Sequence, residues 1–434
     1  MRCALVVSLS LLFLVFAGAA VAQNAATNPP VPPPWVTSPF AVPQTDAGLP
    51  GAGPILREEW FEQLWVLRRS QWAQQIQQDQ GALVFLGDSI TQNWGDKMSG
   101  SFPAVKVANR GISGDTSRGV LIRLKEDVLT LHPSGVILLI GCNDLADGAP
   151  PIVIANNVKL ILAEIEVSYP KIPLILCQVF PSAASTKRPS GSVQKVNQLL
   201  AAALKGDPQV TLVETWRLFA NAVGDAKREE FPDLLHPNKA AYAKWATALH
   251  PLLATYGLMD NEPDHWTPEA GFASLFNGLD LTGWGYVTNN FDGKTNSMEG
   301  RFLARDGRLI AMTSPNYSQE MKLWTTRQFP KDFALRLEFR AMPYANGGIF
   351  IRAPQLQCGD YLLAGPYKNL KQYKAQDWNE IEIVVKNNAA HCTCNGELLE
   401  AALPLPPTGP IGLEADRGQV EYRHIRYEEN DGNR

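Results

Sequence analysis

The chain has 434 residues, of which 45% are hydrophobic and 19% charged, and its formal net charge is −4. This length and composition support two globular cores and exclude a disordered chain. The weak negative charge, with no compensating cluster of Lys or Arg, excludes an electrostatic footprint for nucleic acid or for an anionic membrane surface.

The N-terminus has the pattern of a secretory signal peptide. Arg2 precedes an apolar and small stretch from Cys3 to Ala19, which is followed by Ala20-Val21-Ala22. The stretch is short for a bilayer span and ends in small residues instead of a charged stop, so the pattern disfavours a retained anchor. We expect residues 1–22 to be removed, no membrane attachment afterwards, and a secreted or periplasmic protein.

A proline-rich segment follows this leader. Pro, Ala, Gly and Thr dominate Ala25 to Pro54, and Pro29-Pro30-Val31-Pro32-Pro33-Pro34 favours an extended polyproline-II spacer. We therefore expect residues 23–56 to be a linker in front of the first domain.

Apolar runs alternate with longer helix-like segments through residues 57–258. Such alternation is typical of a mostly parallel sheet that is covered by helices on both faces. The predicted strands are Ala82 to Leu86, Val105 to Ala108, Gly135 to Ile140, Ile172 to Val179 and Val210 to Val213. The predicted helices are Trp60 to Gln78, Ser117 to Thr130, Val153 to Ser168, Ser192 to Leu204 and Asn238 to Leu253, the last capped by Asn238.

A second change of pattern begins at Met259. Asn, Pro, Asp and Gly interrupt both periodicities there, which predicts a linker over residues 259–270. From residue 271 to 430 short alternating strands are separated by turn residues, a pattern that favours an antiparallel sandwich. The clearest predicted strands are Ala334 to Arg340, Gly348 to Arg352, Glu380 to Val385 and Val420 to Tyr427.

Removal of the leader leaves an odd number of cysteines. They are Cys142, Cys177, Cys358, Cys392 and Cys394, so at least one thiol stays free. Cys392 and Cys394 would point the same way along a strand, about 6.6 Å apart, which is too far for an easy mutual disulfide. A bridge from one of them to Cys358 remains open. No pair of His or Cys completes a metal site around Cys-x-Cys, and we expect no metal or organic cofactor.

Chemistry-bearing residues follow the ends of the predicted strands. Ser89 follows the first strand, Gly111 to Thr116 follow the second, and Asn143 follows the third. Asp233 and His236 lie on the loop between the fifth strand and the last helix. Because ligands bind beyond the carboxyl ends of the strands in such sheets, we expect these residues to meet at one rim.

Ser89, His236 and Asp233 are the residue types of nucleophilic acyl transfer. A serine hydroxyl is a weak nucleophile until an imidazole removes its proton, and the imidazole does this best when a carboxylate fixes its tautomer. The spacing of Asp233 and His236 keeps both on one local turn. Attack on an ester carbonyl creates an oxyanion, for which Gly114 and Asn143 can supply hydrogen-bond donors.

Three charged residues near these positions have two interpretations each. Asp88 could be a second acid, but a strand-to-helix turn often uses Asp to satisfy backbone donors, and we favour that structural role. Arg110 and Arg118 could hold an anionic substrate, but we interpret them as solvated surface residues.

Four sequence blocks resemble the SGNH (GDSL-type) hydrolase family between Trp60 and roughly Tyr256. The blocks are Gly87-Asp88-Ser89-Ile90-Thr91, Gly111-Ile112-Ser113-Gly114-Asp115-Thr116, Gly141-Cys142-Asn143-Asp144 and Asp233 to His236. The resemblance implies an α/β flavodoxin-like three-layer domain with Ser89 as nucleophile and Asp233 supporting His236. It also implies an oxyanion hole formed by Ser89, Gly114 and Asn143. With Trp94, the first block is most similar to the platelet-activating-factor acetylhydrolase-like and carbohydrate acetylesterase branches.

The second half resembles the 3-keto-disaccharide hydrolase domain, which implies an all-β concanavalin-like jelly-roll sandwich. The matching segments are 275–284, 346–352, 378–381 and 421–425. Where the family often has Tyr-Glu-x-Gln, this chain has Gly359-Asp360-Tyr361-Leu362-Leu363, so we favour a sugar-binding or accessory role over sugar cleavage. Aromatic side chains that could stack on sugars are Trp284, Trp324, Tyr361, Tyr367 and Trp378, although most should be core.

The function expected from these patterns is an exported serine esterase that deacylates carbohydrate esters through an acyl-serine intermediate. Its partner would be an acylated glycan or a small ester, and the second domain would hold or process the glycan. Three alternatives remain: a glycoside hydrolase activity in the second domain, a lipid or short-chain acyl esterase, and a non-catalytic glycan-binding scaffold.

Overall fold

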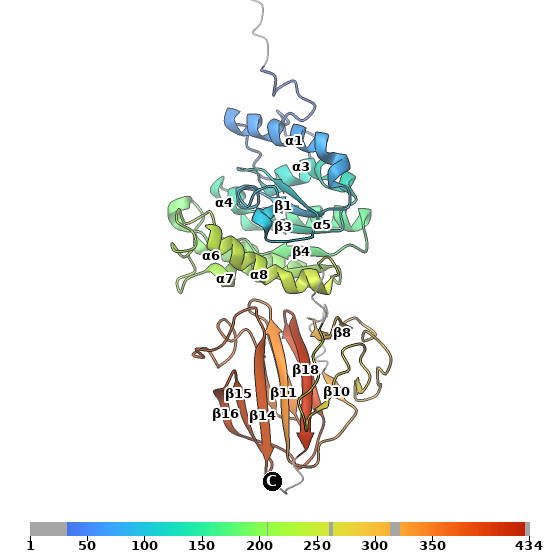
Figure 1. Cartoon of the computed structure of the whole chain (residues 1–434). Coiled ribbons are helices and arrows are strands. Elements are labelled where there is room, and N and C mark those ends of the chain that lie inside the picture. Colours follow the sequence, from blue (N-terminus) through green and yellow to red (C-terminus); the bar gives the residue numbers. More distant parts are fainter. Residues whose placement is uncertain (1–32, 206, 260–263, 313–321, 430–434) are drawn as a thin grey trace, which may run out of the picture.

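The computed structural model describes residues 33–205, 207–259, 264–312 and 322–429. The expected signal peptide, the first part of the expected linker, residues 260–263 and residue 430 lie outside these ranges. The described chain forms an α/β unit followed by an all-β unit, arranged end to end in an elongated molecule (Figure 1). Among the described helices, none combines the length and the apolar character needed to cross a bilayer.

A five-stranded parallel sheet forms the centre of the first unit. Its strands lie in the order β2-β1-β3-β4-β5. All residues of β1, β3 and β4 are buried, as expected for strands with both faces covered. The strands are β1 (Leu83–Gly87), β2 (Val107–Gly111), β3 (Gly135–Leu139), β4 (Leu174–Cys177) and β5 (Val210–Val213).

Helices connect these strands at nearly the predicted positions. The long helices are α1 (Glu59–Asp79), α3 (Ser117–Asp127), α5 (Pro151–Ser168), α6 (Ser190–Ala203) and α8 (Lys239–Thr255). The Asn238 side chain accepts a hydrogen bond from Ala241 N at 3.0 Å, so the predicted cap of α8 is present. Short helices absent from the prediction are α2 (Ser89–Gln92), α4 (Cys142–Ala146), α7 (Thr215–Phe219), and the 3₁₀ turns η1 (Met98–Gly100), η2 (Leu129–Leu131) and η3 (Ala184–Thr186).

The described end of the expected linker packs on the first unit. Val42 is buried, and the backbone of Ala52 both donates to and accepts from the Asn157 side chain on α5. The Arg118 guanidinium bonds Asp46 at 2.6 Å and the carbonyl of Gly53 at 2.9 Å. This part of residues 23–56 is therefore attached to the folded unit and does not act as a free spacer. Its carbonyls and apolar side chains have partners there.

The second unit consists of two antiparallel sheets that enclose a hydrophobic core. One sheet has the order β13-β12-β17-β10-β7; the other follows β16-β15-β14-β11-β18-β9-β8, with β6 paired to β18. Its strands are β6 (Ala273–Ser274), β7 (Trp284–Gly285), β8 (Phe302–Arg305), β9 (Arg308–Ala311), β10 (Leu323–Thr325), β11 (Phe333–Ala341), β12 (Asn346–Ile351), β13 (Gln355–Gly359), β14 (Asn379–Lys386), β15 (Ala389–Cys394), β16 (Glu397–Pro404), β17 (Ile411–Arg417) and β18 (Val420–Glu429). β11 alternates strictly between buried and half-buried residues, as a strand with one face in a sandwich core should. The α/β and jelly-roll-like sandwich classes are thus confirmed.

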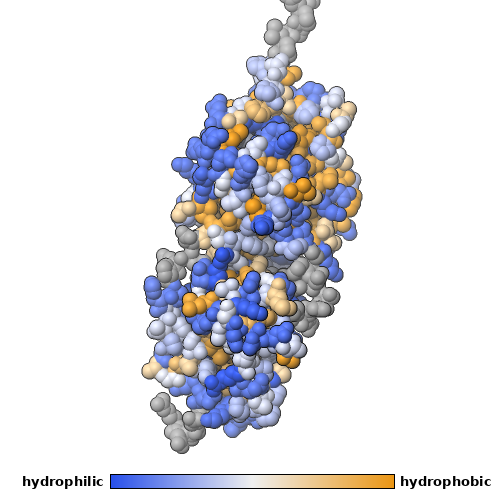
Figure 2. Space-filling model, turned by 90° about the vertical axis from the view of Figure 1, so that its right-hand side faces the viewer, coloured by the Kyte–Doolittle hydropathy of each residue, from blue (hydrophilic) through white to orange (hydrophobic). Residues whose placement is uncertain are grey.

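The two units contact each other at the end of α8 and at α7, beside the edge strand β5 of the first sheet. The Gln419 amide donates to Thr255 Oγ1 at 3.0 Å, and Arg305 donates to the Thr255 carbonyl. The Tyr344 ring lies between the guanidinium groups of Arg217 and Arg417, at 3.7 and 3.6 Å from its centroid. A cavity of about 170 Å³ lies between the edge strand β5 and residues of the second unit. On the face shown in Figure 2, the two units form one continuous body.

Candidate active site

Ser89 lies at a sharp turn from β1 into α2. Gly87 ends the strand, and a Cβ added there would lie 2.3 Å from the Leu139 carbonyl, so only glycine fits. The Asp88 carboxylate accepts from Ile90 N at 2.9 Å and caps α2. The turn thus presents Ser89 at the carboxyl edge of the sheet, as the first residue of a helix.

His236 reaches Ser89 from the opposite end of the sequence. His236 Nε2 lies 3.0 Å from Ser89 Oγ, and His236 Nδ1 lies 2.6 Å from Asp233 Oδ2. The other oxygen of Asp233 accepts from the backbone N–H groups of Leu235 and His236, at 3.0 and 2.7 Å. Leu234 adopts a positive φ of 63°, which closes the turn tightly enough for one carboxylate to meet both neighbours. The structure therefore brings the three predicted side chains into one hydrogen-bonded chain.

The Asp233 carboxylate stays ionised over a wide pH range. Partial burial raises the pKa of this carboxyl, but the hydrogen bonds from the His236 backbone and side chain and from the Leu235 backbone outweigh burial. The net pKa lies below the ordinary value of a free aspartate. An ionised Asp233 fixes the proton of His236 on Nδ1 and leaves Nε2 free to accept from Ser89.

The two predicted oxyanion donors outside α2, Gly114 and Asn143, are linked through Asp115. Gly114 has a φ of +87°, and a Cβ there would lie 2.6 Å from the Trp60 ring. Asn143 on α4 donates from Nδ2 to the carbonyl of Asp115, the residue after Gly114, at 2.9 Å. An amide NH₂ carries two hydrogens, so this bond leaves one of them available to another acceptor.

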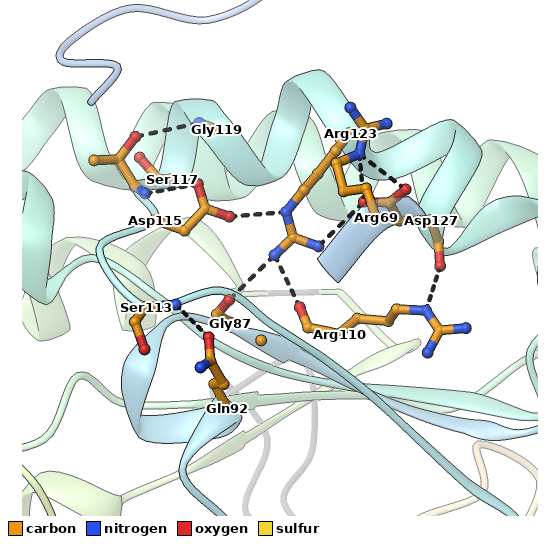
Figure 3. A network of polar contacts seen from close by, with 12 residues as sticks. Arg69, Gly87, Gln92, Arg110, Ser113, Asp115, Ser117, Gly119, Arg123 and Asp127 are labelled. Atoms are coloured by element: carbon orange, nitrogen blue, oxygen red, sulfur yellow. Dashed lines mark hydrogen bonds and ion pairs between the residues drawn. The ribbon is translucent and has the colours of Figure 1, made fainter. Parts of the chain in front are cut away.

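A buried ionic network fixes the loop that carries Gly114 (Figure 3). Arg123 of α3 donates to Asp115 Oδ2 at 2.8 Å and to the carbonyls of Gly87 and Arg110 at 3.1 and 2.8 Å. One guanidinium therefore ties the loop to the ends of β1 and β2. Burial raises the pKa of Asp115 to about 7 against the opposing effect of Arg123.

The interpretation of Arg110 and Arg118 as solvated surface residues is wrong. Arg110 is 2% exposed and pairs with Asp79 at 2.6 Å, while Arg118 is 6% exposed and holds the N-terminal segment. Both guanidinium groups are engaged by carboxylates and backbone carbonyls, so neither faces an anionic substrate. A single sequence does not distinguish a buried, paired arginine from an exposed one.

Two residues around Asn143 were missed from the sequence. The Cys142 thiol donates to Asp88 Oδ2 at 3.0 Å. Burial raises the pKa of Asp88 and raises that of Cys142 well above its ordinary value.

Arg188, in the loop after β4, contacts Asn143 itself. The thiol of Cys142 lies 54 positions from its partner Asp88, and Arg188 lies 46 positions from its partner Cys142. No motif or strand end in the sequence connects these partners, so neither contact was predicted. Within the described ranges, no three His, Cys, Asp or Glu side chains gather as a metal-binding group.

Comparisons with known families match both units. Residues 85–244 match the GDSL-like Lipase/Acylhydrolase family, and residues 271–428 match the 3-keto-alpha-glucoside-1,2-lyase-like domain. Platelet-activating factor acetylhydrolase IB subunit alpha2 of Homo sapiens is 26% identical over 207 residues, which are 46% of this chain and 87% of that protein. Subunit alpha1 of Pongo abelii is 27% identical over 174 residues, 39% of this chain and 74% of that protein.

Solved structures are similar to each unit separately. A putative platelet activating factor from Streptococcus pneumonia is 23% identical, with a TM-score of 0.42, and covers 45% of this chain and 95% of its own. A putative glycosyl hydrolase from Parabacteroides distasonis is 16% identical, with a TM-score of 0.30, and covers 37% of this chain and 95% of its own. Given the family matches, the chain carries a platelet-activating-factor acetylhydrolase-like GDSL lipase/acylhydrolase domain and a 3-keto-disaccharide hydrolase domain, and it is a hydrolase of ester bonds.

Proposed function

We propose that the protein is an exported serine esterase that removes acyl groups, foremost acetyl, from carbohydrate esters. The observation that carries the esterase mechanism is the chain from Ser89 through His236 to Asp233, with contacts of 3.0 and 2.6 Å. The expected leader over residues 1–22 supports export, and the acetylhydrolase relatives support an acetyl ester as the bond that is cleaved.

The first half of the reaction transfers the acyl group to the enzyme. His236 Nε2 takes the proton of Ser89 Oγ as the oxygen attacks the ester carbonyl, and the carbonyl oxygen becomes an oxyanion. The backbone N–H groups of Ser89 and Gly114 and the remaining hydrogen of the Asn143 amide would donate to it. The imidazolium then protonates the leaving alcohol oxygen, which for a carbohydrate ester is a sugar hydroxyl.

The second half restores the enzyme with water. His236 takes a proton from a water molecule that attacks the acyl-Ser89 carbonyl, and the same donors stabilise the second oxyanion. Collapse of this intermediate breaks the bond to Ser89 Oγ, which receives the proton from His236, and releases the carboxylic acid. Neither half needs a group beyond the chain and water.

A cavity in the second unit supports the carbohydrate part of the proposal. It has a volume of about 590 Å³, within the range of sites that hold small ligands. Trp324 of β10 lines it, and the ring lies against β17, where a Cβ at Gly412 would be 2.6 Å from ring atoms. Asn289, Asn290 and Gln328 add amide groups to the lining. An aromatic plane beside amides suits the apolar face and the hydroxyls of a sugar.

The other aromatic candidates are less suited to bind a sugar. Trp284 and Tyr361 are fully buried, and Tyr367 is half-buried with its hydroxyl bonded to Glu400. Arg340 and Arg423 lie over the Trp378 ring, at 4.7 and 4.1 Å from its centroid. Trp378 is therefore a matched control for Trp324.

The test compares acetate release from acetylated glycans with release of a chromophore from short-chain aryl esters, using the full chain. Ser89→Ala should abolish both activities, and Ser134→Ala, at the opposite end of β3, should leave both unchanged. Trp324→Ala should raise KM for the glycan but not for the aryl ester, whereas Trp378→Ala should change neither KM.

Turnover that persists in Ser89→Ala would overturn the serine mechanism. Sugar release independent of Ser89 would move the main activity to the second unit, and equal loss on both substrates in Trp324→Ala would favour a lipid or short-chain acyl esterase.

A further inference from the structure

The loop between β4 and α6 contacts both halves of the active site. At its start, Ser182 Oγ donates to the carbonyl of Leu234, inside the turn that carries Asp233 and His236, at 2.8 Å. At its end, Arg188 contacts Asn143 on α4. The acid–base turn and the oxyanion donor are thus connected through one loop of the sheet's carboxyl edge.

Arg188 is held in a single geometry. It is 9% exposed, and its guanidinium donates from Nε to the Cys142 carbonyl at 2.8 Å and from Nη2 to Asn143 Oδ1, also at 2.8 Å. Nη1 donates to the Thr186 carbonyl at 2.5 Å, within the same loop. All three nitrogens of the fork are engaged, and two of them hold consecutive residues of α4. A lysine ammonium cannot reproduce this planar set of donors.

The bond to Asn143 determines which way the side-chain amide faces. A guanidinium donates only, so the amide atom beside Arg188 must be the oxygen, and the NH₂ must face the other way. There it meets the Asp115 carbonyl at 2.9 Å with one hydrogen. The second hydrogen is the one that an oxyanion on the Ser89 side would accept. Without Arg188, the bond to the Asp115 carbonyl would be the one contact of this set that still opposes a flip of the amide, so the oxygen would turn more easily toward the oxyanion, which it would repel.

The same bond strengthens the donor. A cation that hydrogen-bonds a carbonyl oxygen withdraws electron density from the amide, so the N–H groups on the far side become better donors. Arg188 acts in this way on the Asn143 side chain and, through the Cys142 carbonyl, on the peptide that connects these two residues. The effect is greatest when negative charge develops on the substrate, because only then does the polarised amide face a full charge.

We propose that Arg188 is a positioning residue of the oxyanion hole, which orients and polarises the Asn143 amide for the transition state. The proposal rests on the serine esterase function above. It predicts that Arg188 acts through Asn143 and contributes to kcat more than to KM.

The experiment measures kcat and KM of the full chain on a short-chain aryl ester, with active sites counted by titration with a fluorophosphonate. Arg188→Met should lower kcat per active site by about 10- to 100-fold and change KM by less than about 3-fold, because the missing interaction develops in the transition state. Arg188→Lys should fall between Arg188→Met and the wild type, since it keeps the charge but loses the fork. Arg426→Met removes a similarly buried arginine of the second unit, 6% exposed and paired with Glu269 at 2.7 Å, and should leave kcat unchanged.

A double-mutant cycle separates positioning from general destabilisation. In the Asn143→Ala background, Arg188→Met should lower kcat by less than about 3-fold, because the group through which it acts is gone. An undiminished effect in that background, or an unchanged kcat in the single variant, would overturn the proposal while the serine mechanism stands. If Ser89→Ala keeps its activity, the proposed serine esterase function fails as well. The activity of Ser89→Ala therefore distinguishes a failure of the proposed function from a failure of the proposed role of Arg188.

Discussion

The Asp233 carboxylate meets the imidazole ring of His236 through only one of its two oxygens. Oδ2 lies 2.6 Å from His236 Nδ1, while Oδ1 serves the backbone N–H groups of Leu235 and His236. The pair is far from buried, since the Asp233 side chain is 55% exposed and that of His236 33%. Geometry, more than exclusion of water, therefore fixes the tautomer of the imidazole.

This division of the two oxygens predicts that Asp233→Asn is more harmful than Asp233→Ala. The backbone N–H groups need an acceptor, so the Asn amide would place its oxygen at Oδ1 and its NH₂ toward Nδ1. Nδ1 would then have to accept, and the proton would move to Nε2, where it blocks the transfer from Ser89. We expect kcat to fall by about 10³- to 10⁴-fold in Asp233→Asn. Asp233→Ala, whose imidazole can take either tautomer in water, should retain at least about ten times more activity. An equal loss in the two variants would contradict this account.

Asn143 should contribute to kcat through its remaining amide hydrogen. Asn143→Ala should lower kcat by about 10²- to 10³-fold, the usual effect of removing one oxyanion donor. Asn143→Asp should be worse, because it replaces a donor with a negative charge that faces the oxyanion. Asn197→Ala, which removes another buried amide 5% exposed, provides the stability control. A kcat within about 3-fold of the wild type in Asn143→Ala would remove Asn143 from the oxyanion hole.

Asp144 predicts a pH dependence of stability. Burial raises the pKa of its carboxyl to about 6 in the folded protein, although the Ser117 hydroxyl and backbone N–H donate to it. The reference value is 3.8, so between these two values the folded state binds more protons than the unfolded state. The free energy of unfolding contributed by Asp144 is therefore highest below the lower value, decreases as pH rises through the window, and is constant above about pH 6. At about 1.4 kcal/mol per pKa unit, the decrease is roughly 3 kcal/mol.

Urea denaturation at pH 4, 5, 6 and 7 measures this effect. The unfolding free energy of the wild type minus that of Asp144→Asn should decrease as pH rises to 6 and then stay level. A difference that is independent of pH would show that Asp144 has the same pKa in both states.

The thiols should be inaccessible in the native protein. Cys142, Cys177, Cys358, Cys392 and Cys394 are all buried and free. An aromatic disulfide reagent should detect no thiol in native protein that lacks residues 1–22 and five after denaturation. A count of three after denaturation would instead indicate a bridge, such as the one from Cys358 left open by the sequence.

The sequence predicted the long elements and the site residues for different reasons. β5 was predicted residue for residue at 210–213, since a short apolar run between turn residues has few alternatives. The short helices α2 and α4 escaped detection, because four or five residues carry no helical period. Ser89 and His236, 147 residues apart, were predicted to meet because both follow the carboxyl ends of parallel strands, which lie at one rim of the sheet. Arg188 was not, because its role depends on the direction of a single guanidinium, which no spacing encodes.

The second unit faces the edge strand β5 across a cavity, and it is synthesised after the first unit. β5 is an edge strand, and open edges invite pairing with other chains. The residues that shield it from the far side of the cavity, such as Met342 and Arg417, are synthesised more than a hundred positions later. The first unit must therefore pass through a period in which it is folded but laterally uncovered. Ending the chain at residue 258 would make that period permanent, so aggregation, with an otherwise complete active site, is the expected fate of the truncated enzyme.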